Sequence, residues 1–148
     1  MNIRKPTDYT AMFAALDALM AAQLPQMELY REIGRLVSRR SEKGAAVAAS
    51  EYLQAAYPTA EGFSPRNVRR MRVFYAAYEE SPEIIRLAMS LGWTRNVAIL
   101  EGCGSNEERS WYIRAVLFRM EERQTTGSHR ISGVAAFFSR RAGNFLLY

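Results

Sequence analysis

The sequence predicts an all-α fold of about seven helices in one compact domain. Apolar residues recur at helical spacing along most of the chain, and Pro or Gly residues separate the resulting segments. No segment shows the alternation of apolar and polar residues that would predict a strand with confidence. A length of 148 residues and an apolar share of 49% are typical of one folded globular domain.

Three helices are expected in the first part of the chain. Thr7 or Asp8 is a suitable cap for the first of them, and Pro25 interrupts the helical pattern that follows. The third helix is rich in alanine and stops before Pro58. The expected ranges are 8–23, 26–40 and 44–57.

Four further helices are expected after the turn at residues 58–63. Ser64 and Pro65 have the residue types that favour a helix cap and a first helical position, and Ser81-Pro82 repeats the pair. Asn106 is the expected cap of the last helix. The expected ranges are 64–79, 82–92, 94–101 and 106–124.

The positive charge of the chain is concentrated on one short segment. The formal net charge is +5, and only Lys5 and Lys43 among the 20 cationic residues are lysines. Residues 61–78 carry four arginines and one acidic residue, whereas the segments on either side are nearly neutral. Because arginine's planar group suits phosphates and base edges, this local patch indicates a nucleic-acid partner.

The helix at 64–79 separates its arginines from its apolar residues. At 100° per residue, three of the arginines lie opposite the apolar face that contains Met71 and Phe74. A helix at 44–57, a Pro/Gly turn and a helix with a basic start form a helix-turn-helix layout at 44–79. The residues expected to contact DNA are Arg66, Asn67, Arg69, Arg70 and Arg72. The alternative is a solvated surface, or a protein-interaction module whose arginines meet an acidic partner.

Other chemistry finds little support in the sequence. Cys103 is the only cysteine and His129 the only histidine, so neither has a second ligand of its kind at metal spacing. The acidic pairs are adjacent in sequence and therefore point about 100° apart on a helix. Trp93 and Trp111 are expected to anchor the core of the later helices. We expect no cofactor, metal, small-molecule substrate or enzymatic activity.

The sequence shows no targeting segment. No signal peptide is recognised at the start of the chain, and no apolar run approaches the length needed to span a bilayer. A cytoplasmic location is therefore expected.

The segment 125–148 differs in character from the helices before it. It begins polar and then becomes apolar around Phe137-Phe138 and again at residues 145–148. Three placements are open: packing on the first helix, docking on a second copy or another protein, or contact with a membrane surface through Arg140 and Arg141.

Two segments of the chain resemble a known family. YREIGRLV at 30–37 and GFSPRNVRRMRVFYAAY at 62–78 are similar to the amino-terminal domain of YhcG-type proteins, a bacterial and phage-associated family. The segment from Leu91 to Leu117 resembles a later part of that domain, so the similarity extends over about residues 10–124. The resemblance implies a helical, winged-helix-like or helix-turn-helix-like module at residues 1–124 that binds DNA.

The same resemblance implies a second domain that is not found in this sequence. The family's amino-terminal module usually precedes a nuclease domain of the PD-(D/E)xK type, and no D…ExK constellation follows residue 124. We therefore expect a solitary or truncated module without catalysis, which regulates or targets a nuclease carried by another protein. A homo-oligomer is compatible with either DNA binding or protein interaction.

Overall fold

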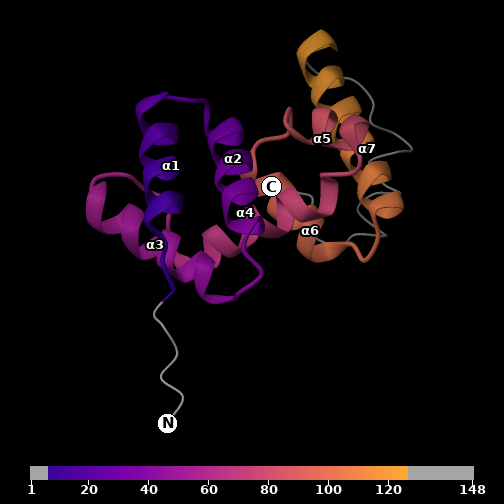
Figure 1. The fold of residues 1–148 in the computed structure, drawn as a ribbon. Coiled ribbons are helices and arrows are strands. Elements are labelled where there is room, and N and C mark those ends of the chain that lie inside the picture. Colours follow the sequence, from indigo (N-terminus) through magenta and orange to yellow (C-terminus); the bar gives the residue numbers. More distant parts are fainter. Residues whose placement is uncertain (1–6, 127–148) are drawn as a thin grey trace. The chain divides into compact units, whose positions relative to one another are not determined.

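The computed structural model describes residues 7–126, and within this range the chain forms seven α-helices and no strand (Figure 1). The all-α prediction is therefore confirmed. The helices are α1 Thr10–Ala21, α2 Gln26–Ser38, α3 Gly44–Ala56, α4 Pro65–Tyr78, α5 Pro82–Ala88, α6 Trp93–Gly102 and α7 Asn106–Thr126. The apolar clusters predicted to dock beyond residue 126 lie outside the described residues.

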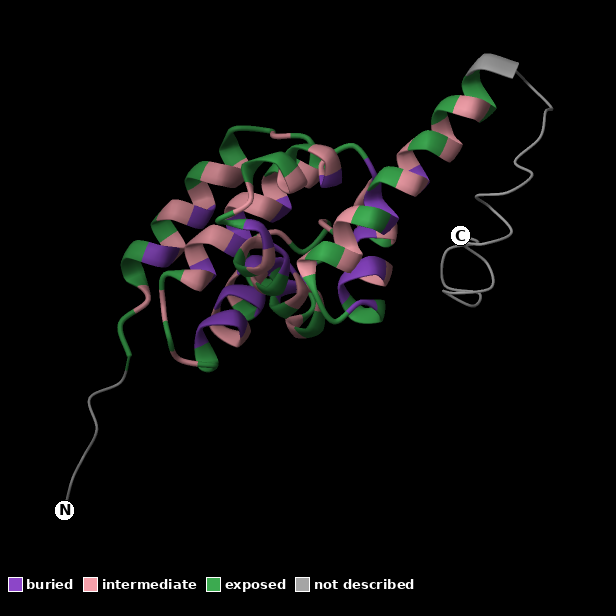
Figure 2. Ribbon diagram, turned by 90° about the vertical axis from the view of Figure 1, so that its right-hand side faces the viewer, coloured by how far each residue is buried: buried purple, intermediate pink, exposed green. Residues whose placement is uncertain are grey.

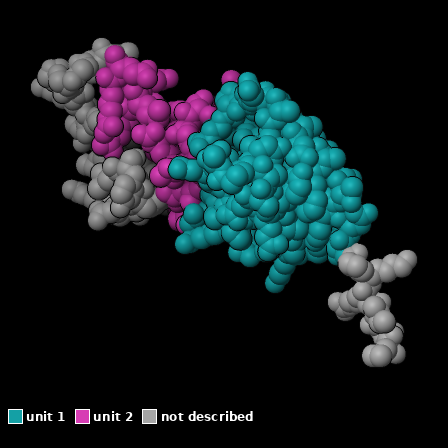
Figure 3. Space-filling view, turned by 90° about the vertical axis from the view of Figure 1, so that its left-hand side faces the viewer, with its two compact units in different colours: residues 1–76 teal, residues 77–148 magenta. Residues whose placement is uncertain are grey.

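The helices form two compact units where one domain was expected. The first unit covers residues 1–76 and the second residues 77–148 (Figure 3). The boundary falls inside α4, so its first twelve residues, Pro65 to Ala76, belong to the first unit.

The first unit is built on the mutual packing of α1, α2 and α3 (Figure 1). Small residues on α3, Ala45, Ala46 and Ala49, are fully buried and allow close approach of the neighbouring helices. The large side chains buried with them include Leu16, Ile33, Val37 and Leu53.

A polar cluster joins α1 to α3 in the first unit. The hydroxyl groups of Tyr52 and Tyr57 donate hydrogen bonds of 2.6 and 2.7 Å to the carboxylate of Asp17. These bonds lower the pKa of Asp17, and the bond to Asp17 raises the pKa of Tyr52 to about 12. The cluster fixes α3, the helix that precedes the predicted DNA-binding helix.

The second unit packs α5 and α6 against α7. The buried side chain of Asn96 donates hydrogen bonds of 2.8 Å to the carbonyl oxygens of Ala88 and Gly92. Gly92 has a φ of 84°, a conformation that favours glycine, and it directly precedes α6. The core residues of this unit include Leu91, Ile99, Tyr112 and Ile113.

Three local predictions for the second unit were wrong. Helix α5 ends at Ala88 instead of residue 92, because the N–H groups of Ser90 and Leu91 bond three residues back and Gly92 then reverses the chain. Asn106 is the first residue of α7, and the hydroxyl of Ser105 provides the cap by accepting the N–H of Glu108 at 3.2 Å. Trp111, predicted to lie in the core, is 40% exposed.

No helix in residues 7–126 is both long enough and apolar enough to cross a bilayer.

Candidate nucleic-acid interface

Helix α4 begins as the sequence predicted. The hydroxyl of Ser64 accepts the backbone N–H of Asn67 at 3.2 Å, and Pro65 occupies the first helical position. The first turn contains no acidic residue. The partial positive charge at this helix start therefore meets Arg66 instead of a compensating carboxylate.

The turn before α4 is closed by a glycine that accommodates a tyrosine. Gly62 has a φ of 90°, and a Cβ atom built on it would lie 2.1 Å from the hydroxyl oxygen of Tyr30 on α2. The side-chain amide of Asn67 donates a hydrogen bond of 2.6 Å to the carbonyl oxygen of Gly62. A larger residue at position 62 would meet both strain and a steric clash.

A second set of buried contacts fixes the same turn. Phe63 is only 4% exposed, and its ring meets that of Tyr30 edge-on, with 6.4 Å between ring centroids. The fully buried hydroxyl of Ser50 on α3 donates a hydrogen bond of 2.5 Å to the carbonyl oxygen of Phe63. The turn is thus tied to both α2 and α3.

Helix α4 also approaches α2 closely at Gly34. A Cβ atom at this position would lie 2.2 Å from the carbonyl oxygen of Met71 and 3.1 Å from the Cβ of Tyr75. Because the nearest atom belongs to the backbone, it has little freedom to move away. The two backbones can lie this close only with glycine at position 34.

The structure divides the five predicted contact residues into two groups. Arg66 and Arg69 are exposed, and Arg70 is half-buried. The guanidinium of Arg72 donates to the carbonyl oxygens of Arg40 and Glu42, the latter at 3.2 Å. Asn67 and Arg72 therefore have structural roles, and the exposed arginines carry the prediction of DNA contact.

The loop that Arg72 holds has its own charged contacts. The guanidinium of Arg40 donates to the carboxylate of Glu42 at 2.7 Å and lies 4.5 Å from the centroid of the Tyr9 ring. The hydrogen bond from Arg40 lowers the pKa of Glu42. Arg40 is thus engaged within the protein.

One exposed apolar residue on the arginine face was missed by the sequence analysis. Val73 is 52% exposed and lies seven, four and three residues after Arg66, Arg69 and Arg70. This spacing places Val73 on the same side of α4 as the three arginines. Extending the helical projection of the arginines by one turn would have found it.

The described residues hold no evident catalytic or metal-binding group. Within residues 7–126, no three side chains of His, Cys, Asp or Glu converge in a way that could hold a metal ion. Cys103 is buried, and burial raises the pKa of its thiol to about 11. A thiol with this pKa is a poor nucleophile near neutral pH.

The supporting residues of α4 coincide with the family-like segments. Tyr30 and Gly34 belong to the YREIGRLV segment, whereas Gly62, Phe63 and Ser64 begin the GFSPRN segment. The two segments meet in the structure, because Tyr30 contacts Gly62 and Gly34 accommodates α4. Both are needed to position the arginine-bearing helix.

Comparison with known proteins gives one family match, which covers residues 13–126 and is described as the DUF1016 N-terminal domain. No curated protein and no solved structure matches the chain significantly. The matched range contains all seven helices except the first residues of α1, and it confirms the resemblance to the YhcG-type amino-terminal domain. The chain belongs to the DUF1016 N-terminal domain family.

Proposed function

We propose that this chain is a non-catalytic DNA-binding module that contacts the duplex through the exposed face of α4. The observation that carries the proposal is the placement of Arg66 and Arg69, both exposed near the positive end of a firmly held helix. Cations at a helix start are slightly unfavourable unless an anion is bound, and a phosphate group supplies that anion.

The surroundings of α4 favour a recognition helix. It has 14 residues, a length of about 21 Å, and its start is fixed by Tyr30, Ser50 and Gly62. A helix held in this way presents its arginines without a large entropic cost on binding. Val73 adds an apolar contact of the kind that thymine methyl groups accept in the major groove.

The arrangement differs in one respect from the shortest helix-turn-helix motifs. Eight residues, 57–64, join α3 to α4, whereas a turn of about three or four residues is usual. We propose a helix-turn-helix-like module with a longer turn, which acts in the cytoplasm and targets or regulates a nuclease carried by another chain. This role follows from the family's usual domain order.

The proposal is tested by fluorescence anisotropy with labelled duplex DNA of random sequence. Binding is measured at about 50 and 200 mM salt, the range in which phosphate contacts change affinity strongly. The Arg66→Ala/Arg69→Ala variant should bind much more weakly. Its log–log salt slope should fall by about two units, roughly one for each phosphate that is no longer neutralised. Circular dichroism checks that helicity is unchanged.

A matched control separates the α4 face from general electrostatic attraction. Arg86→Ala/Arg123→Ala also removes two exposed arginines, from α5 and α7, and lowers the formal charge of +5 by the same amount. The control should retain most of the affinity. Equal losses in the two variants, or no binding by the wild type at the lower salt concentration, would reject the α4 face as a DNA-binding site.

A protein partner is the second candidate, and the exposure of Val73 is the observation that favours it. An interface that depends on apolar burial is less sensitive to salt than one made of phosphate contacts. If DNA binding is absent, an acidic protein that binds the wild type and does not bind Val73→Asp would support this candidate.

A further inference from the structure

Helix α7 exposes two large aromatic side chains on one face. Trp111 is 40% exposed and Phe118 is 50% exposed, and they are seven residues apart with half-buried Ala115 between them. This spacing places all three on one stripe, opposite the side that buries Tyr112 and Ile113. No residue from 117 to 124 is buried, so the stripe continues along an open part of the helix (Figure 2).

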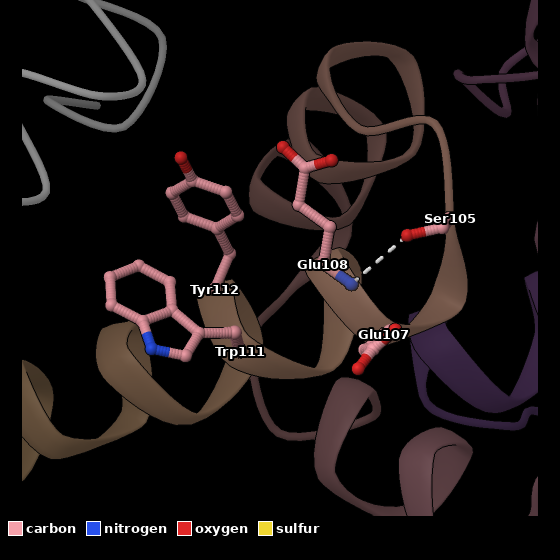
Figure 4. A pocket seen from close by; sticks show the side chains of 5 residues that line it. All are labelled: Ser105, Glu107, Glu108, Trp111 and Tyr112. Carbon is pink, nitrogen blue, oxygen red and sulfur yellow. Dashed lines mark hydrogen bonds between the residues drawn. The ribbon is translucent and has the colours of Figure 1, made fainter.

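A pocket of about 400 Å³ lies at the amino-terminal end of this stripe. It is lined by Ser105, Glu107, Glu108, Trp111 and Tyr112 (Figure 4). The carboxylate of Glu108 and the hydroxyl of Tyr112 extend to the same side of the helix in this view. Two carboxylates beside an indole ring favour a cation, and the planar guanidinium of arginine fits such surroundings well.

The segment that follows α7 has the complementary composition. Residues 127–148 contain Arg130, Arg140 and Arg141 and no acidic residue. The pair Arg140-Arg141 is preceded by Phe137-Phe138 and followed by the apolar residues 145–148. The segment thus combines the apolar groups that the stripe on α7 would bury with the cations that the pocket would bind.

The length of the segment allows it to reach the pocket. Trp111 lies 15 residues before Thr126, the last residue of α7, which is about 22 Å along the helix axis. Residues 127–140 can span up to roughly 46 Å when extended. A chain that runs back along α7 meets Phe118 first and the pocket second, the same order in which Phe137-Phe138 and Arg140-Arg141 occur.

We propose that residues 137–141 dock antiparallel on the exposed face of α7, with Phe137-Phe138 against Phe118 and an arginine of the pair Arg140-Arg141 in the pocket formed by Glu107, Glu108 and Trp111. This docking covers both exposed aromatic residues of α7 from within the same chain. It also assigns a partner to the two carboxylates in the first turn of α7.

The proposal is tested in the full chain by the rate of disulfide formation. The variant Ala115→Cys/Ser139→Cys places one thiol in the centre of the stripe and one between the two docking pairs. The control Ala14→Cys/Ser139→Cys places the first thiol on exposed α1 instead. With oxidised glutathione at low protein concentration, the α7 variant should form an intramolecular disulfide several-fold faster than the control. Cys103 is buried and contributes little.

Charge reversal tests the role of the pocket. Glu107→Arg/Glu108→Arg should slow the cross-link to Ala115→Cys several-fold, and adding Arg140→Glu/Arg141→Glu should restore it. Arg114→Cys, at an exposed position, replaces Ala115→Cys if that variant loses helicity. Equal rates on α1 and α7, faster reaction on α1, or a disulfide between two chains would overturn the proposal. Indifference to charge reversal would do the same.

Discussion

Helices α4 and α7 begin with the same cap but with opposite charge. In each, a serine hydroxyl accepts the N–H of the third helical residue at 3.2 Å. The second helical residue is Arg66 in α4 and Glu107 in α7. Because the start of a helix carries partial positive charge, α7 is compensated by its own sequence and α4 is not. The cap therefore sets where a helix begins, whereas the neighbouring charges set which ligand it favours.

The glycines before the two caps also differ in their surroundings. Gly62 combines a φ of 90° with close contact to Tyr30, whereas a Cβ atom at Gly104 would have no neighbour within 4 Å. The turn before α4 is thus packed at its glycine, and the turn before α7 is open there. This difference suits a helix whose exposed side chains must be held in place for binding.

The largest expected effect comes from filling the packed glycine. Gly62→Ala should lower the free energy of unfolding by about 2–4 kcal/mol, because it adds left-handed strain to a clash with the Tyr30 hydroxyl. Gly104→Ala should be neutral or stabilising by up to about 1 kcal/mol, since it only restricts the unfolded chain. Guanidinium unfolding followed by circular dichroism measures both variants.

The tyrosine supplies a control for this comparison. In a Tyr30→Phe background the hydroxyl is gone and the next atom, Cζ, is 3.3 Å from the added Cβ. Gly62→Ala should then cost less than it does in the wild type, with the remaining cost due to backbone strain. Similar effects of alanine at positions 62 and 104 would contradict the packing difference between the two turns.

The course of the helices was predictable because it depends on local signals. Ser64-Pro65 specifies the start of α4 through capping and a fixed φ, and this start was predicted correctly. The end of α5 was predicted too late, because the φ of 84° at Gly92 and the hydrogen bonds of Asn96 are not visible in an apolar pattern. Local sequence therefore predicts helices better than the tertiary contacts that shorten them.

The candidate site shows the same limit. Helical spacing placed Arg66 and Arg69 on the exposed side of α4, and both are exposed. It could not reveal that Arg72 would bond to two carbonyl oxygens more than 29 residues away. Hydrophobicity similarly predicted Trp111 to be buried, although the buried side of α7 is the one with Tyr112 and Ile113. Contacts between distant segments decided each of these outcomes.

Removal of the serine caps should have a smaller and nearly equal effect on the two helices. Ser64→Ala and Ser105→Ala should each lower the free energy of unfolding by about 1 kcal/mol, because each leaves one backbone N–H without its side-chain acceptor. Ser64→Asp and Ser105→Asp retain an acceptor and serve as controls. An unchanged stability of Ser105→Ala would argue that Asn106 caps α7 instead.

The smallest effect is the sharpest test of the contrast between the two helix starts. Arg66→Gln and Glu107→Gln each neutralise an exposed charge at the second helical position. Arg66→Gln should stabilise the chain by about 0.3–1 kcal/mol and Glu107→Gln should destabilise it by a similar amount, both at low salt. Arg69→Gln, one turn later, should change stability little, since the field of the helix start has decayed there.

Opposite signs at positions 66 and 107 would show that the start of α4 retains an unfavourable charge in the free protein. Such a charge is expected where binding to an anion, and not folding, has determined the residue. Arg66→Gln would then raise stability while weakening DNA binding. A destabilising effect of Arg66→Gln would instead assign Arg66 a structural role, and the α4 face would lose one of the two exposed arginines on which the DNA-binding proposal rests.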